Sequence, residues 1–359
     1  MQKIKNLNFT DALNEAFHQS MDYDKNVIII GEGVPDCNQI FGTTKNLEEK
    51  FGSNRVFDMP LSENALTGIC IGAAQKGLRP VLVHQRLDFA LLSLDQIINN
   101  ASKWYYMFDG KVNVPLVIRL IIGRGWGQGP QHSQNLQALF GMINGLKVVC
   151  PSNAYQAKGL LIAAIEDENP VIFIEHRWQH NTISKVPSKM YSLPLDKSIV
   201  ATKGESLTIV ASLISSIQAR KLVDFFKKEL NISIELIDLI SLNPIDYKTI
   251  IKSLQKTKKF IFLDTANENE TIAHKITSYI FCNHPEVLDK PPLILCSKNY
   301  PAPTSHYLML DYYLSDQSVF YKIVEYLEIQ IDKKIKNLAK KLIANQPHDI
   351  PDKNFKGPF

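Results

Sequence analysis

The sequence predicts two doubly wound α/β domains, each a three-layer α/β/α unit with a mainly parallel central sheet. Short apolar runs rich in β-branched residues alternate with helical patterns along the chain, and in the first half they stand at 27–31, 81–84, 115–122 and 171–175. Strands that are apolar on both sides are typical of sheets covered by helices on both faces. The chain of 359 residues is long enough for two cores of ordinary size.

The helices between these runs carry signals of their own. The helix expected at 10–21 places its apolar residues on one face, and Thr10 stands at its capping position. Gly77 is expected to end another helix just before the next strand. A third helical stretch runs from Asp88 to the aromatic cluster at 104–108.

A polar, proline-containing stretch interrupts the alternation between residues 175 and 206 and indicates a domain boundary near residue 190. Residues 1–190 are then the first domain and residues 191–330 the second. Strands of the second domain are expected at 207–213, 232–237, 260–263 and 292–296. Residues 331–359 are expected to form a lysine-rich helix followed by an extended tail.

The composition disfavours several classes of protein. The net charge of +4 comes from lysine-rich helical stretches, which are typical of solvated helix faces rather than of nucleic-acid surfaces. No window approaches the ~18 apolar residues of a membrane span, and no apolar signal segment opens the chain. Widely spaced cysteines without a CxxC pair indicate free thiols in a reducing compartment. We therefore expect a cytoplasmic protein without nucleic-acid or membrane partners.

Two carboxylates follow apolar strands. Glu63 opens an apolar helix at the edge of a buried layer, where the helix dipole by itself would favour a negative charge. Gly31-Glu32-Gly33 also follows a strand, but Asp36 stands where a dinucleotide fingerprint needs its third glycine. The glycines are therefore interpreted as a tight turn, and a Rossmann oxidoreductase is disfavoured.

The loop at 123–134 follows a strand and combines many glycines with Arg124, Trp126 and His132. In open α/β sheets, ligands bind beyond the carboxyl ends of the strands. Because this composition serves no core, we interpret the segment as a functional loop.

Taken together, these stretches resemble the beta subunit of the thiamine-diphosphate-dependent decarboxylating component of 2-oxo acid dehydrogenase complexes, of the pyruvate, branched-chain and acetoin types. The similarity covers residues 1 to about 330. The motifs that carry it are Leu61-Ser62-Glu63, Gly72-Ala73-Ala74, Gly77-Leu78-Arg79-Pro80, Phe89 with Asp95-Gln96-Ile97-Ile98-Asn99, Gln131-His132-Ser133-Gln134, Gly145-Leu146-Lys147-Val148-Val149, and Asp167 with Asn169-Pro170-Val171.

The resemblance implies roles for four residues. Glu63 would hydrogen-bond ring nitrogen N1′ of the cofactor's aminopyrimidine and so assist loss of the thiazolium C2 proton. Leu61 and Phe89 would make apolar contacts with the pyrimidine. His132 would hydrogen-bond substrate-derived groups and assist transfer to a lipoyl group.

The same resemblance implies a structural monovalent-cation site, with K⁺ as its ion. Carbonyl oxygens would supply most of the ligands, so side-chain identity constrains the site little, and helix capping by Asp167 and Asn169 is a competing explanation. The residues concerned are Leu116, Ala164, Ile165, Asp167 and Asn169.

The family's partner is implied by a missing motif. No Gly-Asp-Gly followed by paired asparagines, which binds the diphosphate and Mg²⁺ in the superfamily, occurs in the chain. An alpha-type subunit would hold that half of the cofactor in a two-alpha, two-beta tetramer. A lipoyl-bearing acyltransferase would be a further partner, although Ile240 stands where the family often has an arginine.

The segment His84-Gln85-Arg86-Leu87-Asp88 replaces the family's apolar, aromatic-rich run before Phe89. Polar groups beside a pocket are costly unless they are used, which favours a polar or hydroxylated acyl group over plain pyruvate.

Two other functions remain open. A transketolase-like carboligase, acting in sugar or surface-polysaccharide biosynthesis, would use the same cofactor but pass the fragment to an aldehyde. Acceptor choice lies in the pocket and the partner chain, so the sequence does not separate it from a decarboxylating dehydrogenase. A non-catalytic scaffold is the third hypothesis, and the presence of both Glu63 and His132 argues against it.

Overall fold

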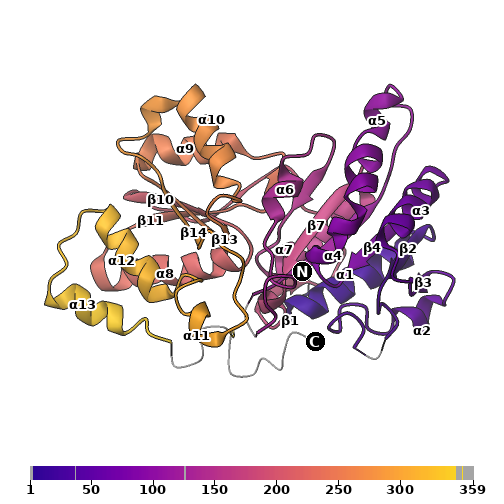
Figure 1. Ribbon diagram of the computed structural model, residues 1–359, viewed down its shortest axis with the longest axis horizontal. Coiled ribbons are helices and arrows are strands. Elements are labelled where there is room, and N and C mark those ends of the chain that lie inside the picture. Colours follow the sequence, from indigo (N-terminus) through magenta and orange to yellow (C-terminus); the bar gives the residue numbers. More distant parts are fainter. Residues whose placement is uncertain (1–2, 37, 125–126, 345–349, 351–359) are drawn as a thin grey trace.

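The structure is a computed structural model that describes residues 3–36, 38–124, 127–344 and 350. Two α/β lobes lie side by side, the first half of the chain on the right of Figure 1 and the second half on the left. Each lobe is built around its own sheet, of seven and of five strands.

The larger sheet has the strand order β12-β6-β7-β5-β4-β2-β3 and is parallel except for the edge strand β12. Four strands lie where the apolar runs predict them: β2 (Val27–Gly31), β4 (Arg79–His84), β5 (Val117–Ile122) and β7 (Val171–His176). The shorter strands are β3 (Val56–Phe57), β6 (Lys147–Val149) and β12 (Ser241–Asn243). The four long strands are buried along almost their whole length, which explains their unbroken apolar character.

Helices cover both faces of this sheet. Helices α1 (Phe9–Tyr23) and α7 (Ala154–Glu166) pack together on one face, where Phe9 and Phe17 are fully buried. Helix α3 (Glu63–Gln75) packs on the other face beside a helical segment that follows β4. The shorter helices are α2 (Leu47–Phe51) and α6 (Gln137–Gly141). The predicted three-layer architecture is therefore confirmed.

The helical stretch expected from Asp88 to residue 108 is not one regular helix. It divides into α4 (Leu87–Ala90), a 3₁₀ turn (Leu91–Ser93), a π-helical turn (Gln96–Ala101) and α5 (Trp104–Met107). The expected cap of α1 is also wrong by two residues: Asn8 Oδ1 accepts from the backbone N–H of Asp11 at 2.7 Å. Gly77 follows α3 with φ +95°, as a helix-ending glycine should.

The smaller sheet has the order β14-β13-β10-β11-β9, with β9 antiparallel. Its strands are β9 (Ile199–Thr202), β10 (Leu207–Ala211), β11 (Ile234–Asp238), β13 (Phe260–Asn267) and β14 (Leu293–Ser297). Its helices are α8 (Leu213–Leu230), α9 (Tyr247–Thr257), α10 (Ala273–Asn283), α11 (His306–Met309), α12 (Asp316–Tyr326) and the lysine-rich α13 (Lys333–Lys340). A separate two-stranded ribbon pairs β1 (Ile4–Asn8) with β8 (Ile183–Pro187).

The domain boundary near residue 190 stays a prediction. Strand β12, from beyond that boundary, pairs with β6 at the edge of the larger sheet, so the chain returns to the first lobe there. The tail predicted after α13 lies outside the described residues except for Ile350. Within the described parts of the chain, no helix is long and apolar enough to cross a membrane.

Candidate active site

Charged residues lie at the carboxyl ends of the strands of the larger sheet, which form one edge of it. Its strands β3, β2, β4, β5 and β7 are parallel neighbours, so the residues that follow them lie along the same carboxyl edge. In that spatial order the edge carries Asp58, Glu32, Arg86, Arg124 and Arg177. The first two form an acidic half with Glu63, and the three arginines form a basic half.

In the acidic half, the Glu32 side chain lies against that of Glu63, and the pKa of Glu32 is raised. Burial, the charge of Glu63, a hydrogen bond with the Glu63 side chain and the charge of Asp58 raise the pKa of Glu32 to about 7. Two carboxyl groups can hydrogen-bond each other only when one of them keeps its proton. The pair Glu32–Glu63 can therefore hold a proton near neutral pH.

Two glycines bring Glu32 into this position. A Cβ at Gly31 would lie 2.3 Å from the carbonyl oxygen of Val83, so no side chain fits between β2 and β4 there. Gly33 has φ +72°, and its N–H donates to Asp58 Oδ1 at 2.9 Å. The predicted tight turn is thus present, and it presents Glu32 to Glu63.

Glu63 is buried at the first turn of α3, with 8% of its surface exposed. Thr67 Oγ1 donates to the Glu63 carbonyl at 2.7 Å, which ties the first turn of the helix together. Leu61, two residues earlier, is 83% exposed. The predicted apolar contact of Leu61 with a pyrimidine thus requires another molecule to cover it.

Phe89 and His132 meet beside the basic half. Their ring centroids are 5.7 Å apart in an edge-to-face arrangement, and both residues are partly buried. Asp88 fixes this contact, because its Oδ1 accepts from the side-chain Nε2 of Gln134 at 2.8 Å and from the Gln134 backbone N–H at 3.3 Å. The loop that carries His132 is thereby attached to the helix that carries Phe89.

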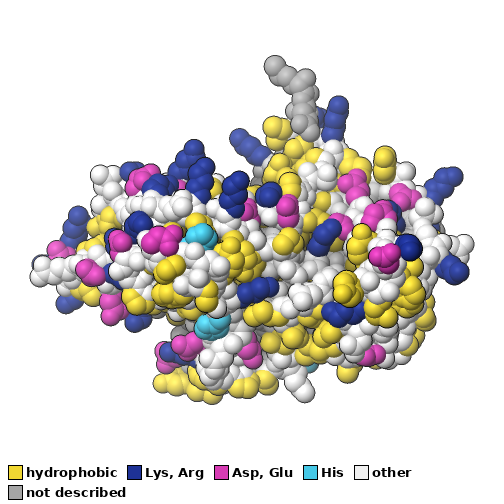
Figure 2. Space-filling view, turned by 90° about the horizontal axis from the view of Figure 1, so that it is seen from above, with side chains coloured by type: hydrophobic (Ala, Val, Ile, Leu, Met, Phe, Trp, Pro, Cys, Tyr) yellow, Lys and Arg dark blue, Asp and Glu magenta, His cyan; other side chains and the backbone are white. Residues whose placement is uncertain are grey.

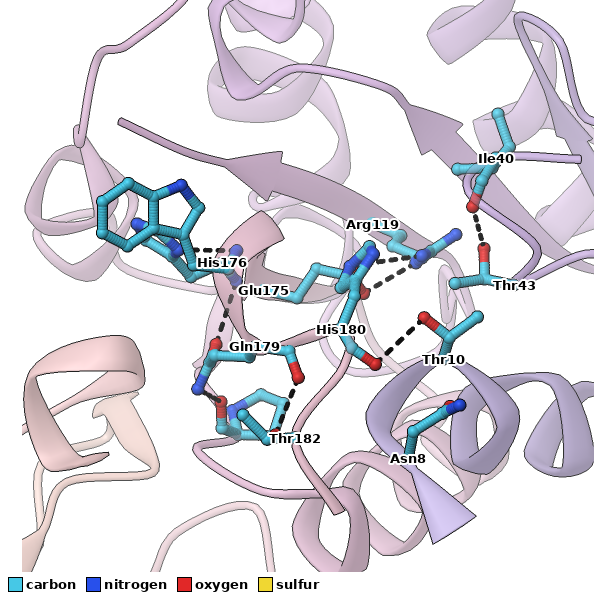
Figure 3. A network of polar contacts seen from close by, with 12 residues as sticks. Asn8, Thr10, Ile40, Thr43, Arg119, Glu175, His176, Gln179, His180 and Thr182 are labelled. Carbon is cyan, nitrogen blue, oxygen red and sulfur yellow. Dashed lines mark hydrogen bonds and ion pairs between the residues drawn. The ribbon is translucent and has the colours of Figure 1, made fainter. Parts of the chain in front are cut away.

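Below the basic half, a buried ion pair joins strands β5 and β7 (Figure 3). Arg119 donates to both oxygens of Glu175, at 2.9 and 2.6 Å, and His180 Nε2 lies 2.8 Å from the same carboxylate. Although burial alone would raise it, Arg119 and His180 lower the pKa of Glu175 to about 2. Burial lowers the pKa of His180 to about 4, so this ring is neutral at pH 7.

Arg124 is clamped between the two lobes. Its guanidinium carbon lies 4.4 Å from the ring centroid of Trp178 and 4.5 Å from that of Tyr313. The start of the predicted functional loop therefore anchors the second lobe to the first. Trp126 of the same loop lies outside the described residues.

The residues predicted for a monovalent cation lie at the opposite, amino edge of the sheet. Arg79 Nη1 donates to the carbonyls of Ile165 and Asp167, at 3.0 and 3.1 Å, and Val171 N–H donates to the carbonyl of Leu116 at 3.0 Å. The Asp167 carboxylate pairs with the ammonium of Lys147. The full set is Leu116, Ala164, Ile165, Asp167 and Asn169. Carbonyl oxygens can accept a second partner, so the cation stays a prediction.

Of the predicted residues, Phe89 and His132 contact each other, and Glu63 lies along the same carboxyl edge of the sheet. Glu32, which pairs with Glu63, is not among the predicted residues, although its place directly after a buried strand was the available signal. Among the described residues, no cluster of three or more His, Cys, Asp or Glu side chains could hold a metal ion.

Comparisons with known proteins identify the family. Residues 5–181 match the family described as transketolase, pyrimidine binding domain, and residues 196–319 match transketolase, C-terminal domain. The chain is 37% identical over 314 residues to acetoin:2,6-dichlorophenolindophenol oxidoreductase subunit beta of Bacillus subtilis, covering 83% of this chain and 91% of the relative. It is 40% identical over 294 residues to pyruvate dehydrogenase E1 component subunit beta of Cyanidium caldarium, covering 82% and 89%.

A solved structure supports the fold. A split-gene transketolase, described as an inactive beta4 tetramer, superimposes with a TM-score of 0.73 at 18% identity, covering 90% of this chain and 99% of that one. At that identity the match supports only the architecture of the two lobes.

Proposed function

Because the chain belongs to the family of transketolase-like E1 beta subunits of 2-oxo acid and acetoin dehydrogenases, we propose that it activates thiamine diphosphate for oxidative decarboxylation of a 2-oxo acid. The acyl group would pass to a lipoyl group. The observation that carries the proposal is the proton-sharing pair Glu32–Glu63 at the same sheet edge as Phe89 and His132.

The described residues fit the pyrimidine half of the cofactor. An aminopyrimidine nitrogen that must gain a proton needs a partner that still holds one at neutral pH, and the pKa of Glu32, raised to about 7, meets that need through Glu63. Phe89 offers a partly buried aromatic face beside His132. When bound, thiamine diphosphate supplies the carbon nucleophile that attacks the 2-oxo group.

The chain's own residues would act in sequence. Glu63 would hydrogen-bond N1′, and Glu32 would supply a proton through its hydrogen bond to Glu63. Phe89 would pack against the pyrimidine and exclude water. His132, oriented by the Asp88–Gln134 contact, would hydrogen-bond the oxygen of the substrate-derived group and assist its transfer.

An alpha-type subunit is the proposed partner, in a two-alpha, two-beta tetramer, and it would hold the diphosphate and Mg²⁺. Exposed apolar side chains support such an interface: Leu61 stands beside Glu63, and Ile69 and Tyr106 are exposed on α3 and α5. Figure 2 shows hydrophobic side chains spread over the right-hand half of the face seen from above, on the first lobe. Covering Leu61 would complete the wall around Glu63.

A reducing, cytoplasmic compartment is proposed as well. The described cysteines, Cys70, Cys150, Cys282 and Cys296, are all free thiols. Burial raises the pKa of Cys70 to about 12, so this thiol is chemically inert at neutral pH.

Cleavage of acetoin is the second candidate, because an acetoin oxidoreductase beta subunit is about as similar as the pyruvate dehydrogenase subunits. The two reactions differ in carbon dioxide release. The test is co-expression with an alpha-type subunit, followed by dye reduction assays with 2-oxo acids and with acetoin. Dye reduction with a 2-oxo acid, with one carbon dioxide released per turnover, supports decarboxylation. Dye reduction with acetoin, without carbon dioxide release, supports acetoin cleavage. Reduction with neither substrate overturns both and favours a scaffold.

A further inference from the structure

The loop that carries His132 is attached to the second lobe. Asn135 closes this loop, because its Nδ2 donates to the carbonyl of Ser133 at 3.0 Å and, at the other end of the loop, to that of Gly123 at 3.4 Å. Its Oδ1 accepts from the hydroxyl of Thr265, a residue of β13, at 2.9 Å. A chain of hydrogen bonds therefore runs from the second lobe to the residue that follows His132.

The direction of these hydrogen bonds follows from the groups involved. The carbonyls of Ser133 and Gly123 can only accept, so the amide nitrogen of Asn135 faces them and its oxygen faces Thr265. Thr265 must therefore donate its hydroxyl proton to Asn135. Both residues are buried, with 6% and 7% of their surfaces exposed, so removal of the hydroxyl would leave the Asn135 oxygen without this donor.

An irregularity in β13 directs this part of the strand toward the first lobe. The pairing of β13 with β14 shifts register between Leu263 and Asn267. Within that stretch Asp264 contacts the first lobe as well as Thr265, because Gln137 Nε2 donates to Asp264 Oδ1 at 2.7 Å. Successive side chains of a regular strand point to opposite faces, whereas a bulge re-aims them, often beside an active site. The irregularity therefore serves the contact between the lobes.

A second contact joins the same loop to the second lobe. Gly129 has φ +70°, and a Cβ at this position would lie 2.5 Å from Thr304 Oγ1, so the loop backbone packs directly against that hydroxyl. On the other side, the loop is attached to the first lobe by the hydrogen bonds from Gln134 to Asp88. His132 therefore stands between an attachment to each lobe.

We propose that Thr265 is a positioning residue for His132: its hydroxyl, acting through Asn135, fixes the backbone beside His132 so that the imidazole meets the substrate-derived group. This proposal rests on the proposed function and gives the second lobe a part in it. A misplacement of about 1 Å can cost a catalytic group about 100-fold in rate. The second lobe would therefore control the rate of the step that His132 assists.

The kinetic test uses Thr265→Val, which keeps the shape of the side chain and removes its hydroxyl, in the complex assembled with its alpha-type partner. Acyl transfer to lipoamide, measured in a single turnover with the 2-oxo acid found active in the dye assay, should slow about 10- to 100-fold, while KM stays within about twofold. Exchange of the cofactor C2 proton should keep its wild-type rate, because Glu63 is not displaced. Thr265→Ser keeps the donor and should restore the transfer rate to within about threefold. An unchanged transfer rate in Thr265→Val would overturn the proposal.

A double-variant cycle shows whether Thr265 acts through His132. In a His132→Ala background, Thr265→Val should change the transfer rate by less than about twofold, since the residue that it positions is gone. A loss of the same size in both backgrounds would mean that Thr265 supports the fold, and the proposal would be wrong. Thr208→Val is the matched control and should leave transfer unchanged, because it removes a buried hydroxyl of the second lobe that contacts Ser253 and Thr257 of that lobe.

A measurement on the complex without cofactor separates this proposal from the proposed function. Amide hydrogen exchange in residues 127–136 should be about 10-fold faster in Thr265→Val and unchanged in Thr208→Val. Asn135→Leu breaks the same chain from the loop side and should speed the exchange as much. If no substrate is turned over yet the loop loosens in this way, the proposed function fails and the attachment of the loop stands. If turnover proceeds and Thr265→Val exchanges these amides as slowly as the wild type, the positioning role alone is wrong.

Discussion

The acidic and basic halves at the carboxyl ends of the strands differ in how they respond to repulsion between like charges. At the acidic half, the pKa of Glu32 rises to about 7, so the repulsion with Glu63 and Asp58 is relieved by keeping a proton. At the basic half, the pKa of Arg177 falls only to about 10, so its charge remains. A carboxyl group can discharge itself near neutral pH, whereas a guanidinium cannot.

This difference assigns different chemistry to the two halves. The acidic half can exchange a proton near neutral pH, whereas the basic half keeps its charge. Perturbed ionisable groups gathered in one cleft are typical of functional sites, because a fold selected for stability alone would separate them. Changes in the acidic half should therefore alter proton transfer, while changes beneath the basic half should alter stability.

The largest expected effect is that of Glu63→Gln in the assembled enzyme. The amide keeps the size of the side chain but cannot supply the proton, so turnover should fall about 100- to 10,000-fold. Exchange of the cofactor C2 proton for deuterium, measured by NMR after an acid quench, should slow with it. His132→Ala is the comparison: it should spare this exchange and impair the later transfer. If the C2 proton exchanges as fast in Glu63→Gln as in the wild type, Glu63 is only a negative charge at the helix N-terminus.

The second effect is on stability and concerns the buried Arg119–Glu175 ion pair beneath the basic half. Glu175→Gln leaves the fully buried Arg119 without its counter-charge, so the free energy of unfolding should fall by about 3–5 kcal/mol. Denaturant unfolding of the assembled complex and of the chain measures this. Replacing both residues, with Arg119→Met and Glu175→Met together, should recover much of the loss. A double variant no more stable than Glu175→Gln would contradict the charge argument.

Glu32→Gln should have a smaller effect on the acidic half, lowering turnover about 10-fold, because Glu63 remains but its proton donor is lost. The rate should also lose an ionisation near pH 7 in its pH profile, which follows from the raised pKa of Glu32. Asp36→Asn, an exposed carboxylate on the same turn, is the control. A wild-type pH profile in Glu32→Gln would exclude a shared proton.

The same pKa shift has a consequence for stability. A carboxyl group that titrates near pH 7 when folded and near 4.5 when unfolded binds more protons in the folded state, so its contribution is full below pH 4.5 and is lost as pH rises through 7. Thermal unfolding of the wild type should therefore show this decline between those pH values. In Glu32→Gln the decline should be shallower.

The smallest expected effect lies at the amino edge, away from both halves. If K⁺ binds the carbonyls around Asp167, replacing Na⁺ by K⁺ at about ten times the dissociation constant should stabilise the protein by about 1.4 kcal/mol. The melting temperature measures this change. Equal melting temperatures in the two salts would indicate that Arg79 and Lys147 fully satisfy these groups.

The sequence by itself determined the elements with the most redundant local signal. Strands β2, β4, β5 and β7 are buried on both faces, so nearly every residue in them is apolar and the pattern is unmistakable. The resemblance to a known family added Glu63, Phe89 and His132. Short edge strands such as β3 and β12 carry too few residues for a pattern, and the helical stretch after β4 changes its hydrogen bonding without changing its composition.

The tertiary structure alone decided which charges meet. Glu32 and Glu63 stand on different strand-to-helix junctions, and Arg86 and Arg177 follow strands that are far apart in the sequence. Their proximity depends on the strand order β7-β5-β4-β2-β3, which places successive carboxyl ends side by side. Local patterns record whether a residue is buried, but a pKa depends on the charges within a few ångströms, and those come from strands that are distant along the chain.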